Sequence, residues 1–119
     1  MKKLKIGWVG SGFVGQVAHL PSFSSIENID ITGLAELRDD LRIKVKNKYN
    51  ILNEFKSHKE LIDYGDFDAI IAIVRRNHTA TIARDILNAG FNLFTEKPMA
   101  SIYSQGRALV EIAKKKNLL

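Results

Sequence analysis

Hydrophobic and polar positions alternate along this 119-residue chain as short apolar runs separated by longer amphipathic segments. The clearest run, Ala-Ile-Ile-Ala-Ile-Val at residues 69–74, is typical of a strand covered on both faces of a parallel sheet. Leu41, Val45 and Tyr49 recur at every fourth position among lysines and predict an amphipathic helix. We expect strands over residues 4–9, 29–35, 51–55, 69–74 and 92–95, and helices over residues 14–23, 39–49, 59–64, 79–88 and 101–116.

The expected elements alternate between strand and helix along the whole chain. This order predicts a parallel sheet with right-handed crossovers, and therefore an α/β fold of the doubly wound, Rossmann type. A chain of this length is a domain of ordinary size, so we expect one domain over residues 1–119. Ligands of such sheets bind beyond the carboxyl ends of the strands, near the point where the strand order reverses. The residues that follow each strand are therefore the candidates for a site.

The first strand is followed by Gly10-x-Gly12-x-x-Gly15, which opens the first helix. Between a strand and a helix, this spacing predicts a dinucleotide-binding loop. Gly10 would permit a tight turn, Gly12 the approach of a pyrophosphate, and Gly15 the close packing of helix on strand. The amides around Phe13 and Val14 would meet the phosphates at the helix N-terminus. The alternative is a glycine-rich turn that binds nothing.

An acidic residue stands at the end of the second strand. Glu36 follows Gly15 by 21 residues, and a carboxylate at this place can accept both ribose hydroxyls of the adenosine, which favours NAD. Arg38 complicates the choice, because a guanidinium beside the ribose could hold a 2′-phosphate. NAD is therefore the expected cofactor, and NADP stays open. The alternative for Glu36 is a solvated residue at the start of a loop.

The fourth strand is followed by Arg75-Arg76-Asn77-His78. Asn77 and His78 could line the nicotinamide end of a cofactor, and we count Val74 with them as a cofactor contact. The alternative is the start of a helix, with Asn77 or Thr79 as the capping residue and His78 exposed. The two arginines form a solvated rim or contact a phosphate or a carboxylate.

The fifth strand is followed by Glu96-Lys97-Pro98, and we place all three residues at the cofactor. Pro98 favours an extended backbone at Lys97 and so fixes where its ammonium points. A lysine at the mouth of a partly apolar cleft can act as an acid or stabilise an alkoxide, so Lys97 is the candidate catalytic residue. The alternative is a surface lysine in a turn. We expect His19 to be packed or capping rather than catalytic, and we assign no role to His58.

Three stretches of the chain resemble the Gfo/Idh/MocA family: IGWVGSGFVGQVAHLPSF, GLAELRDDLRIKVKNKYNI and HTATIARDILNAGFNLFTEKPMA. Members are NAD(P)-dependent oxidoreductases that act mainly on sugars, cyclitols and nucleotide sugars. The resemblance implies that Lys97 lies near the nicotinamide and takes part in the site, and that the Lys97–Pro98 bond is cis. The chain departs from the family at Glu36, where Asp is commonest, and at Val74-Arg75-Arg76, where a small turn is common.

Length is the largest departure from the family. The resemblance implies a sixth strand and a second domain that supplies most substrate contacts, and this chain stops before both. We therefore expect an isolated dinucleotide-binding domain that binds the cofactor without turnover, from a protein with a small sugar-like substrate. The alternative is a free-standing nucleotide-binding or interaction module without catalysis. Surfaces meant for the missing parts would be bare, so we also expect a homo-oligomer.

Composition narrows the classes of partner. The net charge of +5 attracts polyanions, which include a phosphate-bearing cofactor, but no aromatic interleaving or recognition helix points to nucleic acid. The chain has no cysteine and three histidines, so we expect neither disulfides nor a metal site. No apolar run has membrane-spanning length, and the glycine-rich N-terminus is unlike a signal peptide. We expect a cytoplasmic protein that does not bind membranes.

Overall fold

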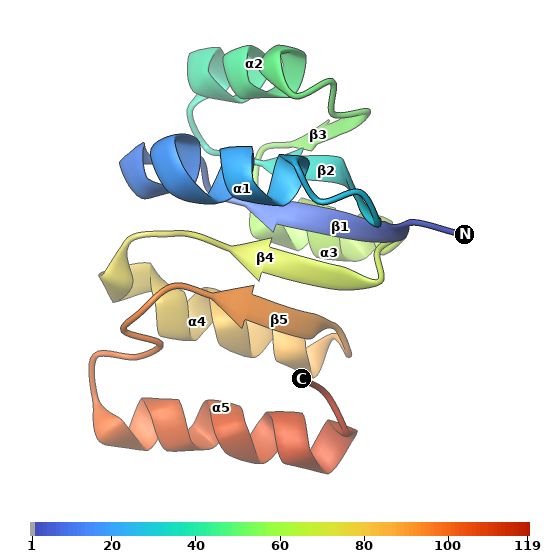
Figure 1. Cartoon of the computed structure of the whole chain (residues 1–119). Helices are drawn as coiled ribbons and strands as arrows, with labels where there is room; N and C mark the ends of the chain where they lie inside the picture. Colours follow the sequence, from blue (N-terminus) through green and yellow to red (C-terminus); the bar gives the residue numbers. More distant parts are fainter. Residues whose placement is uncertain (1) are drawn as a thin grey trace.

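The computed structural model describes residues 2–119, which form a parallel sheet with helices on both faces (Figure 1). The five strands lie in the order β3-β2-β1-β4-β5, so the order reverses beside β1. This arrangement confirms the doubly wound Rossmann-type fold. The strands are β1 (Leu4–Val9), β2 (Ile29–Ala35), β3 (Asn53–Phe55), β4 (Ala69–Ala72) and β5 (Asn92–Thr95).

Helices cover both faces of the sheet, and one further helix packs outside them. Helices α1 and α2 lie on one face, α3 and α4 lie on the other, and α5 packs against α4 (Figure 1). The helices are α1 (Leu20–Ser24), which continues a π-helical turn η1 (Gly15–His19), α2 (Asp39–Lys48), α3 (His58–Tyr64), α4 (Arg76–Asn88) and α5 (Tyr103–Lys116). Within residues 2–119, no helix has the length and apolar character needed to cross a bilayer.

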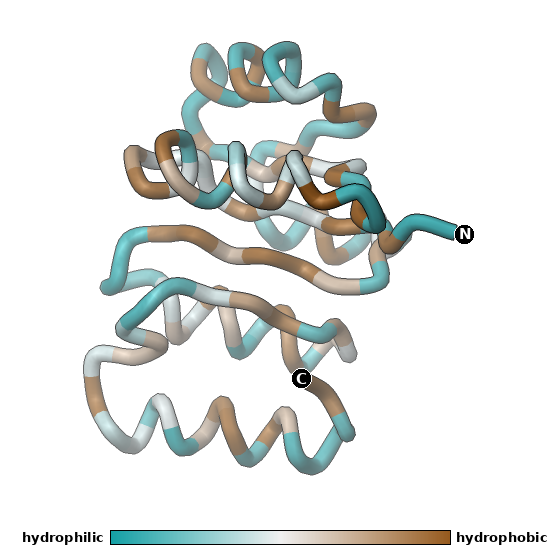
Figure 2. The backbone as a smooth tube through the Cα atoms, viewed as in Figure 1, coloured by the Kyte–Doolittle hydropathy of each residue, from teal (hydrophilic) through white to brown (hydrophobic). Residues whose placement is uncertain are grey.

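Alternate residues of the central strands enter two separate cores. On β4 and just after it, Ile71 and Ile73 pack under α1 and α2, whereas Ile70 and Ala72 pack under α3 and α4. Successive side chains of a strand point to opposite faces, so a strand buried on both sides needs apolar residues at every position. This explains the uninterrupted apolar run that predicted β4, which Figure 2 shows as a hydrophobic segment between polar connections.

Two glycines leave room for one aromatic ring between the sheet and α3. Gly7 of β1 pairs with Gly33 of β2, and the buried Phe67 ring lies over both. A Cβ atom on Gly33 would lie 2.6 Å from the ring, and one on Gly7 would lie 3.1 Å from it. Both distances are shorter than ordinary van der Waals contacts. The glycines are therefore required by packing.

Helix starts differ most from the sequence-based expectation. Helix α4 begins at Arg76 rather than at residue 79, because Arg75 is extended (φ −60°, ψ 141°) and is the capping residue. Helix α5 begins at Tyr103 rather than at residue 101, so Ile102 is the capping residue and is 60% exposed. The first helix continues through Pro21 because the preceding turn is π-helical, with the Leu20 N–H donating to the Gly15 carbonyl.

We predict that Gly33→Ala lowers the free energy of unfolding by about 1–3 kcal/mol, since the new methyl group overpacks the Phe67 ring. Gly106→Ala in α5 is the matched control, because its Cβ would make ordinary contacts with Met99 at 3.5 Å and Ala100 at 3.6 Å in the segment before the helix. That change raises the free energy of unfolding by up to about 1 kcal/mol through helix propensity. Urea denaturation of the three proteins measures both effects, and equal shifts for the two variants would contradict the packing argument.

Candidate functional site

The turn after β1 accepts only glycine at its first position. Gly10 has φ +89°, and its N–H donates to the Ala35 carbonyl at the end of β2 over 2.8 Å. A Cβ atom there would lie 2.4 Å from the Ile73 carbonyl oxygen, which belongs to the segment after β4. The turn therefore lies between the ends of β2 and β4, where ligands of such sheets bind.

The other two glycines of the motif have different surroundings. A Cβ atom on Gly12 would have no atom within 4 Å, so the loop presents bare backbone to an open space. A Cβ atom on Gly15 would lie 3.6 Å from the Gly10 carbonyl oxygen, which is an ordinary contact. The expectation that Gly15 is needed for close packing of helix on strand is therefore wrong, since alanine fits there. Gly12 is the position at which a side chain would fill the space in front of the loop.

The helical run begins directly after this bare backbone. Phe13 and Val14 form its first residues, and they are 78% and 45% exposed. The first amides of a helix have no partner within the helix and carry a partial positive charge. The structure thus places these amides at the start of a helix, and their binding of a phosphate stays a prediction.

The Glu36 carboxylate lies beside the loop, buried and fully hydrogen-bonded. Its Oε1 accepts from the Ser11 amide (3.1 Å), the Ser11 hydroxyl (3.0 Å) and Arg38 Nη2 (3.1 Å). Its Oε2 accepts from the Arg38 amide (2.9 Å) and Arg38 Nε (3.2 Å). The side chain of Glu36 is only 6% exposed, whereas that of Arg38 is 61% exposed. Arg38 therefore covers the face of the carboxylate that would otherwise meet solvent.

This environment decides the charge of Glu36. Burial of the carboxyl works against its ionisation, but hydrogen bonds from Arg38 and Ser11 outweigh burial and lower the pKa of Glu36 from 4.5 to about 2. The group is ionised at neutral pH. An ionised carboxylate can accept hydrogen bonds from the hydroxyls of a ribose, once Arg38 has moved from its outer face.

Three residues that support this end of the site were not expected from the sequence. Ser11 supplies two of the hydrogen bonds to Glu36, and Gln16 Nε2 donates to the Ser11 carbonyl over 2.8 Å. Arg42 is buried in α2 and donates to the Glu36 carbonyl over 3.0 Å. Arg42 also pairs with Asp39 at 2.7 Å. A sequence signal existed for Arg42, which stands three positions before the apolar Val45 and so falls on the inward side of α2.

The segment after β5 is held to the first helix. Nε2 of His19 contacts Oε2 of Glu96, and Oε1 of Glu96 accepts from the Lys97 amide over 3.2 Å. The Lys97–Pro98 bond is cis, as the family resemblance implied, and both residues are exposed. His19 is packed, as expected, but its contact with Glu96 was not foreseen.

The residues after β4 are less enclosed. Val74 is half-buried over the turn, and its Cγ1 would lie 2.9 Å from a Cβ on Gly10. Asn77 and His78 are exposed in the first turn of α4, so the expectation that Asn77 or Thr79 caps the helix is wrong. Thr79 is buried and donates to the Arg75 carbonyl over 3.2 Å. Val74 lies against the glycine loop. The case for Asn77 and His78 as cofactor contacts rests only on their position at the end of a strand.

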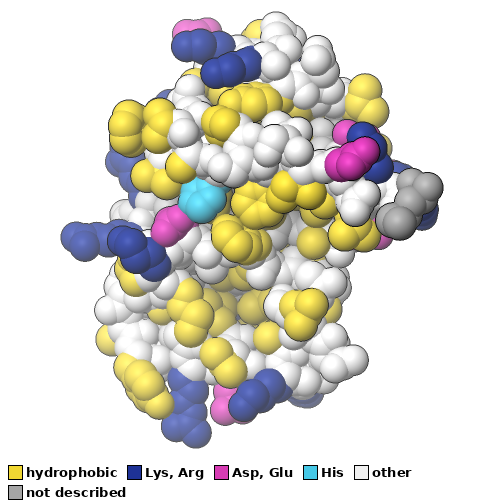
Figure 3. All heavy atoms as spheres, in the orientation of Figure 1, with side chains coloured by type: hydrophobic (Ala, Val, Ile, Leu, Met, Phe, Trp, Pro, Cys, Tyr) yellow, Lys and Arg dark blue, Asp and Glu magenta, His cyan; other side chains and the backbone are white. Residues whose placement is uncertain are grey.

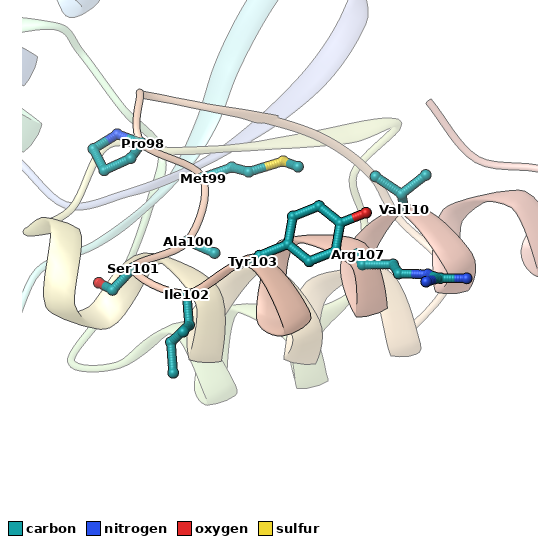
Figure 4. Close-up of a pocket in the computed structure, with 9 residues that line it drawn as sticks. Pro98, Met99, Ala100, Ser101, Ile102, Tyr103, Arg107 and Val110 are labelled. Atoms are coloured by element: carbon teal, nitrogen blue, oxygen red, sulfur yellow. The ribbon is translucent and has the colours of Figure 1, made fainter.

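A shallow apolar hollow of about 520 Å³ lies next to Lys97 in the chain (Figure 4). Pro98 and Met99 form one side and the first turns of α5 the other, with Tyr103 and Arg107 projecting beside it. Lys97 does not line this hollow, so the expectation that the lysine stands at the mouth of an apolar cleft stays a prediction. Among the described residues, no cluster of acidic and histidine side chains could hold a metal ion.

We predict that the acid stability of the fold depends on Glu36. Because its pKa is lower in the folded chain than the 4.5 of a free side chain, its contribution is complete above about pH 4.5 and is lost as the pH falls towards 2. Glu36→Gln removes about 2 kcal/mol of this pH dependence, a figure reduced for solvent screening of the exposed Arg38 guanidinium. Urea denaturation between pH 2.5 and 7 measures it, with Glu27→Gln in the exposed turn before β2 as control. The same pH slope in both variants would contradict it.

Comparison with known proteins gives a consistent picture. The family described as "Oxidoreductase family, NAD-binding Rossmann fold" matches residues 4–119. The chain is 22% identical to a myo-inositol 2-dehydrogenase of Thermotoga maritima, over 98% of this chain and 34% of that protein. It is 25% identical to a levoglucosan dehydrogenase of Pseudarthrobacter phenanthrenivorans, over 100% of this chain and 32% of that protein.

A solved structure of a dehydrogenase from Clostridium difficile has 32% sequence identity and a TM-score of 0.89, and the match covers 98% of this chain and 38% of that one. The chain thus spans about a third of the length of these relatives. The family match covers nearly every residue, including the glycine loop, Glu36 and Glu96-Lys97-Pro98. The chain therefore belongs to the Gfo/Idh/MocA family of oxidoreductases and carries its NAD-binding Rossmann domain.

Proposed function

We propose that this chain binds NAD(H) as the cofactor-binding part of a dehydrogenase that acts on a sugar, a cyclitol or a nucleotide sugar. The observation that carries the proposal is the bare backbone at Gly12 beside the buried, ionised carboxylate of Glu36. The names of the relatives, a myo-inositol 2-dehydrogenase and a levoglucosan dehydrogenase, support the class of substrate.

The residues fit a dinucleotide along the carboxyl edge of the sheet. The amides from Gly12 to Val14 would take the pyrophosphate, because a helix N-terminus favours negative charge and no side chain stands in front of Gly12. Glu36 would accept the adenosine ribose hydroxyls. Val74, Asn77 and His78 would lie along the middle and the nicotinamide end of the cofactor.

Lys97 is the proposed catalytic residue at the other end of the edge. The bound cofactor would accept or supply a hydride at the substrate carbon. The exposed Lys97 ammonium would hold or give a proton at the substrate oxygen, and Glu96 and Pro98 would set the direction of its backbone. Binding without turnover by residues 1–119 alone, and assembly into a homo-oligomer, stay predictions.

We predict that Gly12→Val weakens NADH binding at least about tenfold, because its side chain fills the space in front of the loop that the pyrophosphate needs. Gly15→Ala is the matched control within the same glycine motif, since its Cβ makes only ordinary contacts. It should change the dissociation constant by less than about twofold. Fluorescence titration of NADH with each protein measures the effect. Saturable binding of unchanged affinity to Gly12→Val would refute the assignment of the loop.

We predict opposite effects of Arg38→Ala on the two cofactors. Removing the guanidinium frees the outer face of Glu36 for the ribose hydroxyls, so NADH should bind about threefold more tightly. NADPH should bind more weakly, because its 2′-phosphate loses the Arg38 guanidinium and still faces Glu36. Glu36→Ala should weaken the binding of NADH and strengthen the binding of NADPH, whose 2′-phosphate would no longer face a carboxylate. Parallel titrations of both cofactors measure the ratio, and equal changes for NADH and NADPH would contradict this assignment of the adenosine end.

A further inference from the structure

His19 joins two segments that are 77 residues apart in the sequence. It is the last residue of the π-helical turn η1, and its Nε2 contacts Oε2 of Glu96 at the end of β5. The second oxygen of the same carboxylate accepts the Lys97 amide. One carboxylate therefore connects the helix that begins at the glycine loop with the backbone of the proposed catalytic lysine.

The contact lies in a largely apolar setting. The His19 ring stands edge-on to Phe94, with ring centres 6.0 Å apart, and lies 6.4 Å from Phe23. The side chains of His19 and Glu96 are only 20% and 32% exposed. On the face that carries α1, Figure 3 shows apolar side chains gathered around a histidine and an acidic side chain. The hydrogen bond from His19 keeps the pKa of Glu96 below its ordinary value, and the Lys97 amide adds to this effect.

The π-helical turn helps to direct His19. Gly15 and Leu20 are five residues apart, and both are buried against the core, which a wide turn allows. His19 then lies beside this buried line, at the side of the helix that faces β5. Turns of this kind recur at functional sites.

We propose that His19 is a positioning residue for the nicotinamide end of the cofactor, acting through Glu96 on the backbone at Lys97. The inference rests on the proposed function, because it requires a cofactor that reaches from the glycine loop to Lys97. The Lys97 side chain is exposed, so its position depends on how firmly its backbone is held. The His19–Glu96 contact sets the separation of the two ends before the cofactor arrives, which lowers the ordering cost of binding.

Two ligands separate this role from a general loss of stability. NADH reaches the nicotinamide end, whereas ADP-ribose ends at the ribose that would carry the nicotinamide. His19→Ala should raise the dissociation constant of NADH about five- to tenfold, and that of ADP-ribose by less than about twofold. His19→Gln keeps an N–H near the position of Nε2 and should recover most of the NADH affinity. Calorimetric titration of the whole chain measures both ligands in the same way.

His58 offers a matched control on the other face of the sheet. It pairs with Asp85 over 2.8 Å, and these side chains are 17% and 32% exposed, close to the values for His19 and Glu96. His58→Ala removes a similar histidine–carboxylate pair between α3 and α4 and should leave both dissociation constants unchanged. Glu96→Gln removes only the charge and should shift NADH more than ADP-ribose, which provides the same test if His19→Ala does not fold.

The outcomes distinguish a failure of the proposed role of His19 from a failure of the proposed function. Equal weakening of NADH and ADP-ribose by His19→Ala, or no change in either, would overturn the role of His19 and leave the proposed function standing. If the unmodified chain binds neither ligand, the proposed function is wrong and the role of His19 falls with it. A loss restricted to NADH, together with recovery in His19→Gln, establishes His19 as a positioning residue.

Discussion

Gly10 lies where three parallel strands end together, and the close approach of their backbones fixes the geometry of the whole edge. Its amide is bonded to the end of β2, and the carbonyl of Ile73 after β4 occupies the space that a side chain would need. The indole N–H of the fully buried Trp8 donates to the Gly10 carbonyl over 2.7 Å, so a side chain of the core also holds the turn. Because the chain leaves this turn as a helix, the amides of that helix point towards the place where the strand order reverses.

Two carboxylates hold the segments on either side of this turn. Glu36 connects the loop at Ser11 with the start of the connection after β2, and Glu96 connects the first helix with Lys97. Both carboxylates accept a backbone N–H and a side-chain donor, and both have lowered pKa values. The edge of the sheet is therefore organised by buried or half-buried negative charge, while the exposed groups around it, such as Arg38 and Lys97, are positive. Such an arrangement suits a ligand with phosphates between two polar ends.

Local patterns predicted the strands and the glycine turn, because these depend on neighbouring residues. The run at residues 69–74 and the spacing of Gly10, Gly12 and Gly15 are properties of short windows, and the structure contains the strand and the turn that they predict. The ladder between β1 and β4 joins residues more than sixty positions apart, so the parallel sheet was predicted from the alternation of elements, and its strand order came only from the structure.

Features that depend on contacts between distant segments were not predicted. A histidine at residue 19 looks the same in the sequence whether it meets Glu96 or solvent. The start of α4 was placed too late because the extended conformation of Arg75 leaves no mark in a run of polar residues.

The position of Arg38 has a consequence for the affinity of any ligand at the proposed adenosine end. Its guanidinium occupies the same oxygens of Glu36 that a ribose would use, and it is attached to the chain two residues away. It is thus a tethered competitor, whose effective concentration is set by the short tether and does not fall when the protein is diluted. Any affinity measured at this end is the difference between two sets of hydrogen bonds to one carboxylate. Selectivity between cofactors can then be changed by altering the tether as well as by altering the carboxylate.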